Sequence, residues 1–245
     1  MTELNFPSET VELPSKGLVY SKENPLSSGK IEIKYMTAKE EDILTNQSYI
    51  QNGTVLDKLL ESVIISKVNI KDLIIGDKNA ILVATRILGY GKDYTFSFLG
   101  EEHTVDLTSL ENKEFDASLV KEGKNEFKYT LPHTGNEITF KILDGHDEKK
   151  IEKELAGLKK INKNASPELS TRLKYIVTSV GGETESKSIR EFVDNFLLAR
   201  DSRSLREFIN THQPDIDLTY TLDSGEEVTV PIGLNFFWPD YGDNI

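Results

Sequence analysis

The sequence predicts an α+β fold, with helical segments interspersed with three antiparallel β-hairpins, an extended N-terminal arm and an aromatic C-terminal tail. Two periodicities predict the elements: apolar residues recur at helical spacing in some segments, and alternate with polar residues in pairs of short segments joined by turns. The ends follow neither pattern. Residues 1–29 lack any periodicity, and the last dozen residues gather the single tryptophan, two phenylalanines and a tyrosine.

The first 29 residues form the expected arm, because prolines, glycines and serines interrupt any regular pattern there. Within the arm, apolar residues flank a turn-forming stretch over residues 13–20. Such a strip either lies on its own domain or reaches a neighbouring protein, and the sequence leaves both alternatives open.

A helical region with the first hairpin is expected over residues 30–110. It starts with an alternating strand over residues 30–35, and Thr37 and Glu40 then have the spacing of a capping box, in which each side chain satisfies a backbone N–H of the other residue. Asp77 is placed to cap a later helix that stops at the glycines 89 and 91. We expect helices from Thr37 to before Asn52, over 54–66 and over 77–88, followed by a hairpin over 94–107.

The remaining residues, 111–245, contain two further hairpins around a block of four helices. A long polar connection over residues 108–125 suggests a boundary, although the sequence leaves open whether the chain has one core or two. The pentads that begin at Ser188 and Ser204 read as capping boxes of short helices. We expect hairpins over 127–142 and 217–232 and helices over 147–163, 166–180, and from Ser188 and Ser204 onward.

Composition excludes several functional classes. The 245 residues include 29 Lys and Arg against 41 Asp and Glu, a net charge of −12, which disfavours nucleic acids and anionic membrane surfaces as partners. The absence of cysteine excludes disulfides and thiolate sites, and no apolar run approaches the length of a membrane span. Together with the polar N-terminus, these features favour a protein of the cytoplasm or of a particle assembled there.

Charge is also unevenly distributed along the chain. Residues 147–206 hold 13 Lys and Arg and 10 Asp and Glu, whereas residues 207–245 hold eight acids and no Lys or Arg. This asymmetry is typical of complementary docking surfaces, although a solvated acidic end explains it equally well.

No motif in the sequence predicts a reaction. The glycines around residue 90 lack the dinucleotide-binding pattern, and no Gly-Lys pair continues into a phosphate-binding loop. The four histidines, His103, His133, His146 and His212, lack metal-ligand spacing and are expected at the surface. Paired carboxylates remain possible among 41 acids, because their spacing is spatial rather than sequential. We therefore predict a protein that is not an enzyme and has no cofactor or metal.

Apolar side chains near both ends of the chain are the candidate partner-binding residues. Large aromatic side chains are unfavourable in water by roughly 1.5–3 kcal/mol each, so they are covered either by the chain's own fold or by a partner. Aromatic residues also dominate the energetics of protein interfaces. The candidates are Leu13, Leu18 and Tyr20 near the N-terminus and Phe236, Phe237, Trp238 and Pro239 near the C-terminus.

Five motifs in order resemble one known family. They are Leu-Pro-Ser-Lys-Gly-Leu (13–18), Lys-Tyr-Met-Thr-Ala-Lys-Glu-Glu-Asp-Ile-Leu-Thr-Asn (34–46), Gly-Asp-Lys-Asn-Ala (76–80), Ile-Leu-Gly-Tyr-Gly (87–91) and Phe-Phe-Trp-Pro (236–239). Their order and spacing resemble the baseplate hub and hub-assembly proteins of T-even-type contractile-tailed phages, especially marine relatives. The resemblance runs almost from end to end of the chain.

The resemblance implies a non-enzymatic structural or assembly component of the tail baseplate, with other hub and tail proteins as partners. It places the protein in the virion, and in the host cytoplasm during assembly. Two alternatives stay open: a carboxylate-dependent cell-wall hydrolase of the hub, and a transient assembly chaperone absent from the mature virion. Some relatives carry Cys-x-x-Cys at the hairpin equivalent to residues 98–103, and its absence here means that no metal site is carried over.

Overall fold

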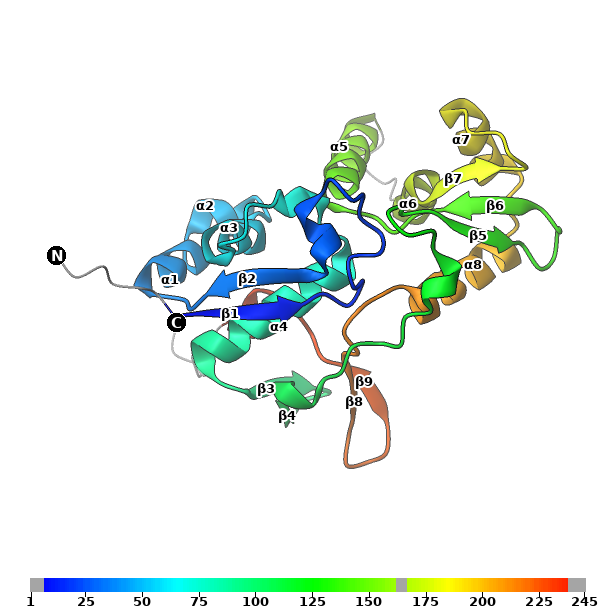
Figure 1. Cartoon of the computed structure of the whole chain (residues 1–245). Helices are drawn as coiled ribbons and strands as arrows, with labels where there is room; N and C mark the ends of the chain where they lie inside the picture. The colour runs from blue at the N-terminus through cyan, green and yellow to red at the C-terminus, as the bar shows by residue number, and fades with distance from the viewer. Residues whose placement is uncertain (1–6, 162–166, 238–245) are drawn as a thin grey trace.

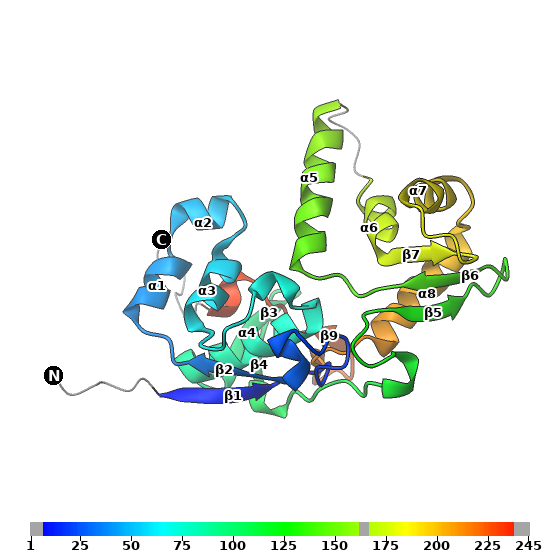
Figure 2. The ribbon, with the colours of Figure 1, turned by 45° about the horizontal axis from the view of Figure 1, so that its top comes forward.

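A computed structural model of the chain, which describes residues 7–161 and 167–237, has the predicted α+β fold. Helices α1–α4 and the sheets β1–β2 and β3–β4 lie on one side of the molecule, and the three-stranded sheet with α6–α8 lies on the other (Figure 1). Helix α5 projects between these two lobes (Figure 2).

The helices and strands alternate along the chain in short elements. The helices are α1 (Ala38–Leu44), α2 (Gln47–Gln51), α3 (Val55–Val63), α4 (Ile75–Tyr90), α5 (Gly145–Ile161), α6 (Glu168–Ile176), α7 (Ser186–Asn195) and α8 (Ala199–His212). The strands are β1 (Ser8–Glu12), β2 (Lys30–Lys34), β3 (Asp93–Phe98), β4 (Glu101–Asp106), β5 (Phe127–Thr130), β6 (Glu137–Phe140), β7 (Val177–Val180), β8 (Thr219–Thr221) and β9 (Glu227–Thr229).

All three predicted hairpins are confirmed. Strands β3 and β4, β5 and β6, and β8 and β9 pair antiparallel, with Tyr94 opposite Val105, Tyr129 opposite Ile138 and Tyr220 opposite Val228. Alternation of apolar and polar residues sets this register, because a shift by one residue would turn every apolar side chain to the opposite face.

The described part of the predicted arm lies on its own domain. Strand β1 pairs along its length with β2, and the loop between them returns with Leu13, Val19 and Leu26 buried. Gly17 makes this loop possible: its φ is +78°, and a Cβ there would lie 2.4 Å from the carbonyl oxygen of Ser27. The alternative of an arm reaching toward a neighbour does not apply to residues 7–29 of this structure.

The capping box at the first helix is confirmed, and the helix is shorter than predicted. Thr37 and Glu40 bond each other's backbone as expected at the start of α1. The helix then ends at Leu44, because the side chain of Asn46 accepts the N–H groups of Ser48 and Tyr49 and starts the separate helix α2.

The predicted block of four helices between the second and third hairpins is present, but it also contains a strand, and its helices begin at other residues than predicted. Residues 177–180, predicted as the end of a helix, instead form the edge strand β7 beside β6. Their Val-Thr-Ser-Val sequence favours a strand, and the Thr139 hydroxyl bonds the hydroxyls of Thr178 and Ser179. Helices α7 and α8 begin before the Ser188 and Ser204 pentads, so the prediction that these serines cap their helices is wrong.

One cluster of buried apolar side chains connects both lobes. It includes residues from every hairpin and from the connection 108–125, where Phe115 and Val120 are buried. The same connection is tied to the last hairpin, because the Lys113 N–H donates to the carbonyl of Asp215 at 2.8 Å. None of the helices within residues 7–161 and 167–237 has the length and apolar character needed to cross a membrane.

Glu40 provides a test of this fold through its dependence on pH. Burial raises its pKa, but hydrogen bonds from Lys34, Ser62 and Thr37 outweigh burial and lower the pKa to about 2. The stabilisation is therefore complete above the unfolded-state pKa of about 4.3 and is lost as pH falls toward 2. Glu40→Gln should cost about 1–3 kcal/mol at pH 7 and progressively less below pH ~4.

Urea unfolding at pH 7 and pH 3 measures this difference. Asp42→Asn, on the exposed face of the same helix, is the matched control and should change stability little at either pH. A Glu40→Gln penalty that is equal at both pH values would contradict the assignment.

Candidate functional site

The N-terminal segment is attached to the start of α4 by a buried carboxylate. Asp77 accepts hydrogen bonds from the Ser15 N–H at 2.9 Å, from the Ser15 hydroxyl at 2.7 Å and from the Tyr20 hydroxyl at 2.6 Å. The Tyr20 oxygen in turn accepts the N–H of Ile74 at 3.2 Å. We call Ser15, Tyr20 and Asp77 the Asp77 cluster.

Asp77 was predicted to cap this helix, and that prediction is wrong. The helix begins two residues earlier, at Ile75, and the carboxylate turns toward the N-terminal segment instead. Burial raises the pKa of Asp77, an effect that the Ser15 and Tyr20 hydrogen bonds oppose. The preceding residue must be glycine, because a Cβ at Gly76 would lie 2.0 Å from the carbonyl oxygen of Pro214.

The C-terminal segment is attached to the other end of α4 by a buried guanidinium. Arg86, 1% exposed, donates to the carbonyl oxygens of Phe236 at 2.8 Å, Gly91 at 2.9 Å and Asp93 at 3.2 Å. We call Arg86 and these three carbonyls the Arg86 cluster. Its guanidinium also lies over the ring of Tyr94, at 5.9 Å from the centroid.

Four of the seven predicted partner-binding residues are covered by the chain itself. Leu13, Tyr20, Phe236 and Phe237 are buried in the core, and the rings of Tyr94 and Phe236 meet edge to face with centroids 4.8 Å apart. Leu18 is half-buried against the same core. Trp238 and Pro239 lie outside the described residues. For the four buried side chains, the structure therefore favours the intramolecular alternative, in which they stabilise the fold.

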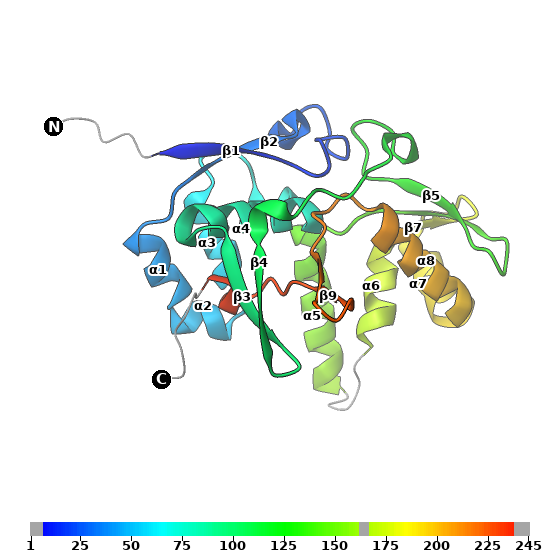
Figure 3. The same cartoon turned by 90° about the horizontal axis from the view of Figure 1, so that it is seen from below.

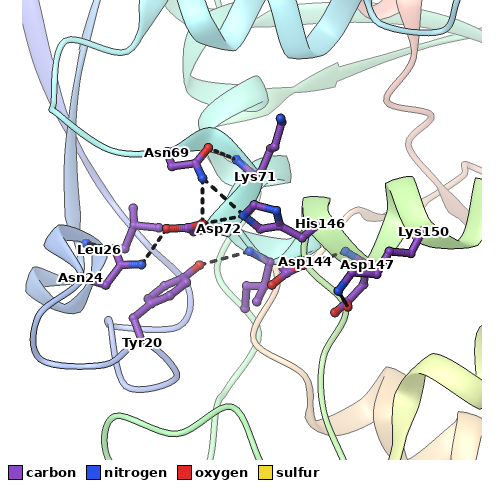
Figure 4. A network of polar contacts seen from close by, with 11 residues as sticks. Tyr20, Asn24, Leu26, Asn69, Lys71, Asp72, Asp144, His146, Asp147 and Lys150 are labelled. Atoms are coloured by element: carbon purple, nitrogen blue, oxygen red, sulfur yellow. Dashed lines mark hydrogen bonds and ion pairs between the residues drawn. The ribbon is translucent and has the colours of Figure 1, made fainter. Parts of the chain in front are cut away.

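A cleft of about 430 Å³ lies between the α2–α3 turn, the turn that precedes α4 and the base of α5. Beside it, the Asp72 carboxylate accepts from Asn24 at 2.9 Å and from Asn69 at 3.1 Å, and lies 2.9 Å from Nε2 of His146 on α5 (Figure 4). This network joins the N-terminal lobe to α5. The cleft is lined by charged side chains of both signs: Asp57, Lys71, Lys78, Asp144, Glu148, Lys149, Glu152 and Arg172.

The carboxylates of the cleft are mostly engaged by structural partners. Asp57 pairs with Lys78 at 2.6 Å, and Glu148 forms a bidentate pair with Arg172 at 2.8 and 3.0 Å. Burial raises the pKa of Asp144, which sequence reasoning had not singled out. Asp144 also accepts the N–H of Asp147 at 2.9 Å, as a helix-capping side chain does at the start of α5.

The histidines lie outside the core, in agreement with the sequence. His133 and His146 are exposed, and His103 and His212 are partly exposed. His133 serves the fold: its N–H donates to the buried Asp201 of α8 at 2.8 Å, which attaches the second hairpin to that helix. Within residues 7–161 and 167–237, no group of three or more possible ligands is close enough to hold a metal ion.

Among residues 7–161 and 167–237, the exposed large apolar side chains lie between Ile65 and Leu198. Leu99 at the tip of the β3–β4 hairpin is 86% exposed, and Phe196 and Leu198 between α7 and α8 are 59% and 51% exposed. Sequence analysis did not single out these residues, although Leu99 follows Phe98 out of the alternating pattern, next to Gly100 in the expected turn. Others in the described chain are Ile65, Ile75, Ile161 and Leu169.

Comparison of the chain with protein-family models, curated proteins and solved structures finds no match.

We expect the protein to lose stability when either side-chain donor of the Asp77 cluster, Ser15 or Tyr20, is removed. Ser15→Ala and Tyr20→Phe each remove a hydrogen bond from a buried carboxylate, and each should lower the free energy of unfolding by about 1–3 kcal/mol. The two losses should be non-additive, because both donors serve one carboxylate.

Chemical denaturation of the single and double variants measures these losses. Ser21→Ala, an exposed serine of the same segment, is the control and should lie within ~0.5 kcal/mol of the original chain. Strictly additive losses would argue against a shared carboxylate.

Proposed function

We propose that this chain is a non-enzymatic protein-binding component of a contractile-tail baseplate hub, either structural or acting during hub assembly. The observation that carries the proposal is the ordered set of five motifs that resembles the hub and hub-assembly family. Their residues contribute to the clusters that hold this fold together.

The location of the motifs in the structure supports a resemblance in fold to the hub and hub-assembly family. Ser15 of the first motif and Asp77 of the third meet in the Asp77 cluster. Glu40 of the second motif forms the capping box. Gly91 of the fourth and Phe236 of the fifth supply carbonyls to the Arg86 cluster. A sequence similarity concentrated in packing positions is expected of proteins that share an architecture and act through their surfaces.

Exposed apolar side chains support a binding role. Single exposed apolar residues are common on protein surfaces. However, Phe196 and Leu198 lie two residues apart in one short connection, and aromatic side chains of this kind are enriched in interfaces. The permanent component and the transient chaperone would both use such a surface.

The role in the hub is tested by removing the chain from the phage that encodes it. We expect tails to stall before a complete hub forms, as seen by electron microscopy of infected-cell lysates, with rescue by the original chain supplied in trans. Mass spectrometry of purified virions then separates a permanent component from a chaperone. Normal baseplates without the chain would refute the proposal.

A second candidate, the cell-wall hydrolase, is favoured by one observation: the cleft holds Asp144, a carboxyl whose pKa burial raises, with Glu152 on the same lining. A raised pKa is what a general acid requires. The hydrogen bond from the Asp147 N–H gives Asp144 a structural role as a helix cap, and this role requires no catalysis. We therefore rank the hydrolase second.

Asp144→Asn distinguishes the two functions, because asparagine keeps the helix cap and removes the acid. We expect the purified chain to release no soluble fragments from peptidoglycan, and Asp144→Asn to retain the original thermal stability and hub incorporation. Measurable turnover by the original chain that disappears in a folded Asp144→Asn variant would favour the hydrolase instead.

A further inference from the structure

The tip of the β3–β4 hairpin carries a leucine in an unfavourable position. Leu99 has φ of +51° and is 86% exposed, and it is followed by Gly100 with φ of +87°. A two-residue turn with two positive φ values favours Asn-Gly, because a leucine Cβ is strained there. The leucine therefore incurs both backbone strain and exposure to water. Such outliers gather at functional positions, which points to a contact made by this side chain.

The surroundings of Leu99 are acidic. The β3–β4 and β8–β9 hairpins lie side by side, since the Phe96 and Tyr220 rings meet with centroids 5.8 Å apart and the Tyr220 hydroxyl donates to the Thr104 carbonyl at 3.3 Å. Neither residues 93–112 nor residues 207–245 contain a Lys or Arg. We call the exposed side chains of Leu99, Glu101 and Glu102 the tip surface.

A complementary surface lies on the other lobe. The connection between α7 and α8 exposes Phe196 and Leu198, and Arg200 and Arg203 follow on the outer face of α8. We call these four residues the elbow surface. The Arg203 side chain is 76% exposed and forms an ion pair with Glu207 at 2.7 Å. The nearby Asp201 is buried and accepts from the backbone of His133, so its carboxylate faces inward. Phenylalanine and arginine are the residue types enriched at interface centres.

The two surfaces lie on different lobes of the same molecule. The β3–β4 hairpin belongs to the N-terminal lobe, whereas α7 and α8 lie at the far end of the other lobe (Figures 1 and 3). A contact between them therefore requires two molecules.

We propose that the tip surface of one copy docks against the elbow surface of a second copy, with Leu99 against Phe196 and Leu198 and the glutamates against the arginines. This contact deepens the proposed assembly function, on which its biological meaning rests. Each copy keeps one free tip and one free elbow, so the contact is head-to-tail and continues into a ring or a filament. Opposite charges across the contact make the association weaken as salt rises.

Sedimentation velocity of the purified chain tests this contact. We expect oligomers at micromolar concentration in 50 mM salt that shift toward monomer in 500 mM salt. Leu99→Asn, which suits the turn better, should keep or raise thermal stability while weakening association at least tenfold. Phe196→Ser should weaken association similarly, with Leu198→Asn as a second variant of the same surface. Ile65→Asn, an exposed apolar residue outside both surfaces, is the matched control and should associate like the original chain.

Mixing the two defective variants tests the head-to-tail geometry. Leu99→Asn keeps an intact elbow and Phe196→Ser an intact tip, so the mixture should form a one-to-one complex and nothing larger. A chain that stays monomeric at every concentration, variants that associate normally, or a mixture that stays monomeric would overturn the proposal. Because the measurement uses the purified chain, it fails or succeeds independently of the hub-assembly experiment in the phage.

Discussion

The structure depends on helix α4, whose buried Asp77 carboxyl group and buried Arg86 guanidinium hold the N-terminal and C-terminal segments. Asp77 in its first turn binds the N-terminal segment, and Arg86 in its last turns binds the C-terminal segment. The two residues are nine positions apart, which corresponds to about 13 Å along a helix. A buried polar or charged group that loses its hydrogen-bond partners is strongly unfavourable, so both segments must stay in place for the helix to stay buried.

This arrangement explains why Leu13, Tyr20, Phe236 and Phe237 are covered by the chain itself. The donors that satisfy Asp77 bring Tyr20 into the core, and the carbonyl that satisfies Arg86 brings Phe236 with it. In the described part of the chain, the exposed apolar side chains include Leu99 at a hairpin tip and Phe196 and Leu198 between two helices. A binding role for the protein rests on those positions.

The charged side chains of the cleft beside α5 have structural partners, which weakens the case for a catalytic role. Asp57 joins α3 to α4 through Lys78, Glu148 joins α5 to α6 through Arg172, and Asp144 caps the start of α5. Several of the charged side chains in the cleft therefore serve the packing of helices against one another. The hydrolase interpretation requires that Asp144 also perform a reaction, and nothing in its contacts requires one.

Local patterns in the sequence determined the α+β class, the three hairpins and the capping box of Thr37 and Glu40. Each depends on neighbours within a few residues, so periodicity and turn chemistry suffice. Local chemistry was misleading where long-range contacts compete. Asp77 is a residue type that often caps helices, but its side chain accepts hydrogen bonds from residues about 60 positions away. Residues 177–180 continue a helical pattern of apolar residues, but they pair with β6 as a strand.

Only the tertiary structure decided which apolar side chains are covered. Leu99 and Phe196 are as apolar as many buried residues yet face solvent, and Phe236 lies in a segment whose cover, by the fold or by a partner, the sequence left open. Burial depends on what the rest of the chain places over a side chain, and that information is spread over segments as distant as Arg86 and Phe236. The sequence alone determined the hairpins and most of the helices, whereas tertiary packing determined which apolar side chains are covered.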